Sequence, residues 1–271
     1  MPSPMKNYAI LLPVVFLWST MAVAQNAPAL CSDRPGNATP TCVAQPGAIQ
    51  IETSLIDWTR NEDGSVETNS YLFGDSLIKF GIAGDTELRV GFMPYQYDRS
   101  ESAGRVSSAE GLGDISLSAR HRLIEGSALG GLSFAVQPFL SLPVGSAEVS
   151  AGTWSAGFVA PVDIPGPNNW SFNLSPMVAA LADSDGDGRH FLYSGTVAAG
   201  RSLSRNLSAT LELFAERDRD PAGHTTTVTA DGMLAMQAGP DTQFDVATYV
   251  GLSDDAPAIE LIMGFTRRFR P

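Results

Sequence analysis

The chain has 271 residues, of which 44% are hydrophobic, enough for one large β domain or two ordinary domains. Its formal net charge of -12 argues against nucleic acid as a partner, because phosphates attract basic surfaces. A mean hydropathy of +0.01 excludes neither a soluble protein nor a transmembrane barrel, since lipid-facing and lumen-facing residues alternate in a barrel.

The first 24 residues have the pattern of a cleaved signal peptide. Lys6 supplies the positive start, residues 8–21 are almost uninterruptedly apolar, and Ala22-Val23-Ala24 is a small-x-small cleavage site. The alternative is an uncleaved membrane anchor, which Pro13 and the Ala-Val-Ala ending disfavour. We therefore predict export, with cleavage after Ala24.

Residues 25–47 are rich in Pro, Asn, Ala and Thr and have no periodicity. We predict an extended periplasmic lead-in segment. Cys31 and Cys42 are the only cysteines, and in an oxidising compartment they are predicted to form a disulfide that staples a short loop. Leu30 stands where a lipid-attachment site at Cys31 would need a small residue, so a lipoprotein anchor is not expected.

From Ile49 onward, apolar and polar side chains alternate with the period of a β-strand. Leu211 and Leu213, for example, share one face while Glu212 is on the other. About twelve strands are predicted, at residues 49–59, 67–83, 86–97, 111–125, 131–144, 153–164, 169–182, 190–203, 206–217, 225–238, 241–253 and 257–269. The predicted fold is all-β: residues 48–271 form a closed antiparallel transmembrane β-barrel with the even strand number of bacterial barrels.

The predicted connections alternate in length. Five are tight, at residues 84–85, 125–130, 165–168, 204–205 and 239–240. The others are mostly longer and more polar, at residues 61–66, 98–110, 145–152, 183–189, 218–224 and 254–256. Short periplasmic turns that alternate with longer external loops are typical of an outer-membrane barrel.

The carboxyl end resembles the assembly signal of outer-membrane proteins. Apolar residues occupy alternate positions from Ile259 to Phe265, and Phe269 is the terminal aromatic. Arg267 interrupts the pattern and Arg270-Pro271 extends past it, so the match is partial. No stretch of the exported chain is long and apolar enough for a membrane helix, so a membrane location requires a closed barrel.

The order of several short motifs is similar to that of a known family. They are the run from Pro46 to Trp58, Phe73-Gly-Asp75, the run Thr86-Glu-Leu-Arg-Val-Gly-Phe92, Gly111-Leu-Gly-Asp114 and Gln137-Pro-Phe139. Over about residues 46–269 the chain resembles the putative MetA-pathway of phenol degradation family of outer-membrane transporters. The resemblance implies a barrel that moves aromatic or other small organic compounds across the outer membrane.

Charged side chains within the predicted strands should face the lumen, because a charge that faces lipid at mid-bilayer costs roughly 2 to 4 kcal/mol. The predicted lumen-lining residues are Lys79, Arg89, Asp114, Arg120, Arg122, Glu212, Asp245, Glu260 and Arg268. Two interpretations remain open: a selectivity lining that acts on solutes, or opposite charges that pair across a narrow barrel and partly plug it.

Two further patterns concern metal binding and catalysis. Asp183, Asp185 and Asp187 match the opening of a calcium loop, but Ser194 stands where the closing Glu would be, and a solvated loop is the alternative. His121, His190 and His224 lack the His-x-Ser-Asn-Gly pattern of barrel phospholipases. No cofactor motif is present.

These patterns predict a non-enzymatic channel or transporter in the outer membrane of a Gram-negative bacterium, which passes small organic molecules, aromatic compounds among them, by passive diffusion. The expected partners are outer-membrane lipid, the barrel assembly machinery and a small-molecule solute. The alternatives are an outer-membrane hydrolase of the phospholipase type and a secreted β-sandwich binding protein.

Overall fold

The computed structural model describes residues 29–126 and 131–270. In these ranges, the segments in which apolar and polar side chains alternate form sixteen β-strand segments. The predicted signal peptide lies outside the described residues. The segments are β1 (Ile49–Asp63), β2 (Val66–Phe73), β3 (Ser76–Ala83), β4 (Thr86–Phe92), β5 (Tyr95–Ser102), β6 (Arg105–Gly111), β7 (Ile115–Ile124), β8 (Ser133–Leu142), β9 (Ser155–Val159), β10 (Val162–Pro165), β11 (Trp170–Ala182), β12 (Arg189–Ser202), β13 (Leu207–Asp218), β14 (Thr225–Gln237), β15 (Thr242–Gly251) and β16 (Ile259–Phe269).

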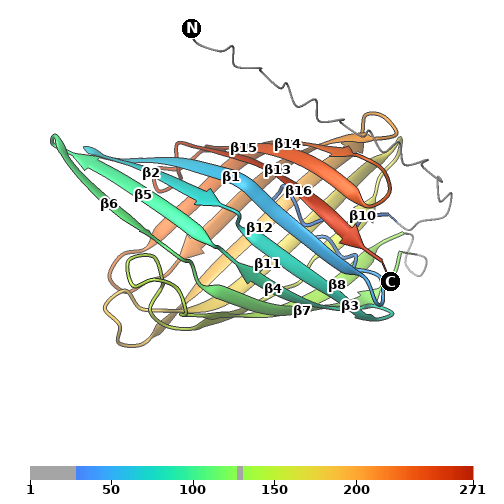
Figure 1. Ribbon diagram of the computed structural model, residues 1–271, viewed down its shortest axis with the longest axis horizontal. Helices are drawn as coiled ribbons and strands as arrows, with labels where there is room; N and C mark the ends of the chain where they lie inside the picture. Colours follow the sequence, from blue (N-terminus) through green and yellow to red (C-terminus); the bar gives the residue numbers. More distant parts are fainter. Residues whose placement is uncertain (1–28, 127–130, 271) are drawn as a thin grey trace, which may run out of the picture.

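These segments form the wall of a closed antiparallel barrel (Figure 1). Four wall strands are interrupted and count as two segments each: β2 with β3, β4 with β5, β6 with β7, and β9 with β10. The last strand closes the barrel on the first, with Ile49 opposite Phe269. The prediction of a closed barrel of about twelve strands is confirmed.

Two connections predicted as long loops are tall β-hairpins instead. Residues 61–66 belong to β1 and β2, which turn at Gly64 (φ 58°), and residues 98–110 belong to β5 and β6, which turn at Ala103 and Gly104 (φ 48° and 76°). The loop predictions for these two segments were wrong. Strands that leave the lipid have water on both faces, so they lose the apolar-polar alternation by which strands were recognised.

The outward face of the barrel is apolar. In β13, Leu211 and Leu213 are 67% and 51% exposed, while Glu212 between them is 7% exposed. An exposed apolar band around a polar interior is what a lipid-embedded barrel requires. Within the described ranges, no helix has the length and hydropathy of a membrane-spanning segment.

The two ends of the barrel differ. One end, here called the turn end, carries the beginning of β1, the end of β16 and short connections such as residues 203–206 and 238–241. The other, the loop end, carries the two tall hairpins and the connections at residues 143–154, 183–188 and 219–224.

Candidate functional site

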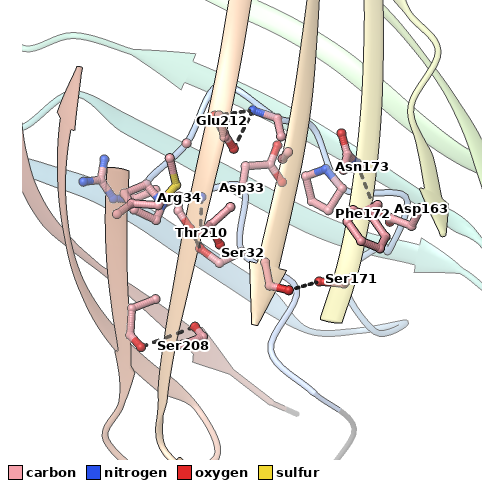
Figure 2. A pocket seen from close by; sticks show the side chains of 18 of the residues that line it. Ser32, Asp33, Arg34, Asp163, Ser171, Phe172, Asn173, Ser208, Thr210 and Glu212 are labelled. Carbon is pink, nitrogen blue, oxygen red and sulfur yellow. Dashed lines mark hydrogen bonds between the residues drawn. The ribbon is translucent and has the colours of Figure 1, made fainter. Parts of the chain in front are cut away.

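The N-terminal segment lies inside the barrel. Residues 31–44 are here called the plug. Their backbone N–H groups donate hydrogen bonds to side chains of β4, β10, β11 and β13. Figure 2 shows Ser32, Asp33 and Arg34 among strands that carry Glu212 and Asn173. The predicted periplasmic position of residues 25–47 is therefore corrected for the part that the structure describes. An irregular segment must find partners for its backbone groups, and the polar inner wall supplies them.

A disulfide between Cys31 and Cys42, whose Cα atoms are 5.8 Å apart, closes the plug into a loop. Cys31 is almost fully buried. The loop is therefore stapled within the lumen.

Six buried or largely buried charges anchor one side of the plug. This paired cluster consists of three carboxylates and three cations: Asp33, Glu52, Glu87, Lys79, Arg89 and Arg120. Lys79 Nζ lies 2.5 Å from both Asp33 Oδ1 and Glu52 Oε1, and Arg120 Nη2 lies 2.6 Å from Asp33 Oδ2. Arg89 also pairs with Asp33. Buried charges are tolerated when they are paired in this way, so Asp33 ties the plug to three wall strands at once.

The other side of the plug is held by carboxylates of the wall. Glu212 accepts hydrogen bonds from the backbone N–H of Asn37 (2.8 Å) and of Ala38 (3.3 Å). Asp163 accepts from the backbone and the hydroxyl of Thr41, at 2.8 and 2.6 Å. Arg34 of the plug pairs with Asp245 of β15 at 2.9 Å. Because these partners come from widely separated strands, the plug crosses the lumen.

Two cavities border the plug, and both are lined by Asp33, Arg34, Pro35 and Gly36. The inner cavity, of about 280 Å³, is lined by residues near the turn end, such as Ser171, Gly200 and Ser208 (Figure 2). The outer cavity, of about 330 Å³, is lined by residues further toward the loop end, such as Asp57 and Glu260. The plug thus separates two hollows of the same lumen.

A family model described as the putative MetA-pathway of phenol degradation matches residues 32–269. The chain belongs to this family. Its matched region includes most of the plug as well as the barrel wall.

Solved structures with the same fold are outer-membrane barrels. An outer membrane channel from Pseudomonas putida F1 is 14% identical, with a TM-score of 0.64, covering 87% of this chain and 99% of that one. The β domain of the Bordetella autotransporter BrkA is 13% identical, with a TM-score of 0.56, covering 83% and 100%. The translocator domain of the autotransporter NalP from Neisseria meningitidis is 15% identical, with a TM-score of 0.50, covering 88% and 90%. No curated protein sequence matches the chain.

The family membership and the fold place this chain in the outer membrane of a Gram-negative bacterium. In such barrels short turns face the periplasm, so the turn end is the periplasmic end and the loop end is external. The inner cavity is therefore on the periplasmic side of the plug, and the outer cavity is on the external side.

Most of the predicted lumen-lining residues contact the plug or its surroundings. Lys79, Arg89 and Arg120 belong to the paired cluster. Glu212 and Asp245 bind the plug on its other side, and Glu260 lines the outer cavity.

The remaining predicted lumen residues lie elsewhere. Arg268 bonds to Asp241 and to the carbonyl of Ala29 at the periplasmic end. Arg122 pairs with Asp85 and Glu125 at the same end. Asp114 lies between β6 and β7 and accepts hydrogen bonds from the backbone N–H groups of Gly145 and Ala151, both at 3.0 Å. These three residues brace turns and a loop.

The predicted calcium loop is held by its own contacts. Asp183 Oδ1 bonds to His190 Nδ1 at 2.9 Å, and Asp185 accepts from the backbone N–H of Asp187. Asp220 of the neighbouring loop accepts from the backbone N–H of Ala222 and of Ser184, and these bonds hold the pKa of its carboxyl below the usual value. In the described ranges, no three His, Cys, Asp or Glu side chains are arranged to hold a metal ion.

Sequence reasoning missed several charged residues of the lumen. Glu52 and Glu87 of the paired cluster, and Asp231 of the opposite lining, are on strand faces that the alternation directs inward. Asp57 faces inward only because a β-bulge between Ser54 and Ile56 shifts the alternation of β1, which the sequence did not indicate. The same alternation that selected Arg89 could have found Glu87. Asp33 carries no such signal, because the plug has no periodicity.

Proposed function

We propose that this family member is a passive channel of the outer membrane for small organic molecules, aromatic compounds among them, which diffuse through the lumen past the plug. The observation that carries the proposal is a polar lumen with a cavity on each side of an anchored but irregular segment. A constriction of this kind limits solutes by size and charge, as the linings of channels do.

The contacts of the histidines favour a conduit over a hydrolase. His121 bonds to Thr86, and His190 lies between Asp183 and Asp218. Among the described residues, no histidine has a serine hydroxyl as a hydrogen-bond partner. The arrangement by which a base activates a serine nucleophile is therefore not the one observed around them.

Planar-bilayer conductance of the refolded protein tests the channel. We expect discrete single-channel steps in KCl, and a refolded barrel that produces no steps would contradict a conduit. Phenol and cyclohexanol, which have similar size but differ in aromaticity, then test the solute class. Stronger reduction of the current by phenol is expected for an aromatic preference, and equal reduction by both would remove that part of the proposal.

A further inference from the structure

Five carboxylates lie side by side along one part of the lumen wall. This acidic arc consists of Glu212, Asp231, Glu260, Asp57 and Asp75. The strand registers place them next to one another: Glu212 is opposite Asp231, and Tyr249 is opposite both Asp231 and Glu260. Asp57 follows on β1, and Asp75 lies in the break between β2 and β3. The arc thus spans neighbouring strands across the seam that closes the barrel.

The arc has no cation of its own. No member forms an ion pair among the described residues, in contrast to the paired cluster, where three cations meet three carboxylates. Of the described residues, Arg34 is the one cation that lines the outer cavity, and its guanidinium is engaged by Asp245 and by the Ser54 hydroxyl at 2.6 Å. Arg34 is close enough to Asp57 and Asp75 to interact with their charges, but none of the arc carboxylates has a direct ion pair within the described ranges.

Two carboxylate oxygens of the arc also lack a hydrogen-bond donor. Asp231 is only 3% exposed and its Oδ1 has no hydrogen-bond partner among the described residues, while Oδ2 accepts a long bond of 3.4 Å from Asn37. Asp57 Oδ1 is buried without a partner as well. A buried acceptor left unsatisfied is unfavourable by about 1 to 3 kcal/mol. Of these two residues, Asp57 lines the outer cavity, so a donor held in that cavity would be bound favourably at its oxygen.

The outer cavity offers a site with two kinds of lining. Asp57, Asp75 and Glu260 supply the negative charge, while Leu77 and Ile262 supply apolar surface. At about 330 Å³ the cavity has the size of a small-molecule pocket. Because no three of the described carboxylates are arranged around a metal ion, the lining fits a larger cation with an apolar part better than a bare divalent ion.

We propose that the outer cavity binds a small organic cation, with its ammonium group among Asp57, Asp75 and Glu260 and its apolar part against Leu77 and Ile262. An ammonium group would supply the donor that Asp57 Oδ1 lacks, together with a positive charge beside the three carboxylates. The inference deepens the proposed function by naming a solute class, but the binding step itself requires no transport.

Titration calorimetry on the folded, detergent-solubilised protein tests this site, with benzylammonium as the probe and benzyl alcohol as its neutral analogue. We expect benzylammonium to bind and benzyl alcohol to bind at least about tenfold more weakly, since charged hydrogen bonds carry the recognition. Equal affinity for the two probes, or no binding of benzylammonium at millimolar concentration, would overturn the proposal.

The double variant Asp57→Asn with Glu260→Gln should weaken benzylammonium binding by about tenfold or more. The control variant Glu148→Gln with Asp254→Asn removes the same two charges from exposed loop positions and should bind as the unaltered protein does. Unchanged binding in the arc variant would contradict the site. If that variant fails the heat-modifiable gel shift of a folded barrel, Asp75→Asn alone replaces it, with the same expected direction.

Conductance separates this inference from the proposed function. Channel steps without benzylammonium binding would overturn the cation site and leave the channel standing. Benzylammonium binding without channel steps would overturn the channel and leave the cation site standing.

Discussion

The paired cluster and the acidic arc are two charged regions of one lumen, and they differ in how their charges are compensated. Around Asp33, three cations from β3, β4 and β7 meet three carboxylates at hydrogen-bonding distances. Around Asp231 and Glu260, no described cation pairs with the carboxylates. The first region has little charge left for a solute, and the second has charge that only a solute, an ion or a proton can balance.

We propose that both interpretations of the lumen charges apply, each to a different region. Lys79, Arg89 and Arg120 pair with Asp33 of the plug and hold it in the lumen. Glu260 lines the outer cavity instead and is not part of that pairing. We therefore assign anchoring to one region and solute contact, as a proposal, to the other.

The largest effect is expected from Asp33→Asn, which breaks the paired cluster. The variant leaves three buried cations without their shared partner, and loss of one member of a buried ionic network is unfavourable by about 3 to 5 kcal/mol. The plug should detach from this side of the wall. Bilayer conductance should rise, and protease should cleave the plug faster than in the unaltered protein.

Asp85→Asn is the matched control for Asp33→Asn. Asp85 pairs with Arg122 at the periplasmic end, where its side chain is 47% exposed. An exposed pair contributes less than about 1 kcal/mol, so conductance should stay as it is. Equal conductance of the two variants would show that Asp33 does not hold the plug.

A smaller effect is expected from replacing both Cys31 and Cys42 with Ser. The disulfide closes a loop with a sequence separation of 11. A cross-link over that length is worth about 2 to 3 kcal/mol by restricting the open chain. Because Asp33 and Arg34 still anchor the plug, we expect it to stay docked but to open more often, which appears as excess noise in the single-channel current.

Addition of reductant to the unaltered channel should reproduce that noise, and the Ser variant should not respond to reductant. A Ser variant without excess noise in its single-channel current would show that the ion pairs alone hold the plug.

Much of the barrel could be predicted from the sequence, because lipid outside and water inside impose a strict alternation. Leu211, Glu212 and Leu213 illustrate this rule, and all twelve wall strands were found by it. The rule fails where the environment is the same on both faces. Residues 105–111 of β6 lie in a hairpin beyond the apolar band, and the polar sequence of residues 105–110 predicted a loop.

The plug could not be predicted in the same way. The irregular character of residues 25–47 and the two cysteines were visible, but a periplasmic location was inferred from position in the chain alone. The partners of Asp33 are 46, 56 and 87 residues away in sequence. Nothing local to Asp33 indicates them, and only the closed barrel brings Lys79, Arg89 and Arg120 to it.

Asp231→Asn makes in the acidic arc the same chemical change that Asp33→Asn makes in the paired cluster. Removing a buried, unpaired charge should leave the free energy of unfolding unchanged or raise it by about 1 kcal/mol. The bond to Asn37 can persist through the new amide oxygen. Urea unfolding in lipid vesicles measures the change, with Asp63→Asn at an exposed hairpin position as the control. A loss greater than that of Asp33→Asn would mean that Asp231 is compensated after all.

The smallest effect is expected outside both regions, at Asp241 in the periplasmic turn before β15. Burial opposes ionisation there, but hydrogen bonds from Arg268 and Arg270 and their charges outweigh it, so the pKa of the Asp241 carboxyl is below the usual value. A lowered folded-state pKa stabilises the fold above about pH 4, and this contribution is lost as the pH falls through the lowered value. The unfolding midpoint of the unaltered protein should therefore exceed that of Asp241→Asn at pH 7, and the gap should close toward pH 3. Asp254→Asn, in an exposed loop, should follow the unaltered protein throughout, and a gap that widens on acidification would reverse the assigned sign.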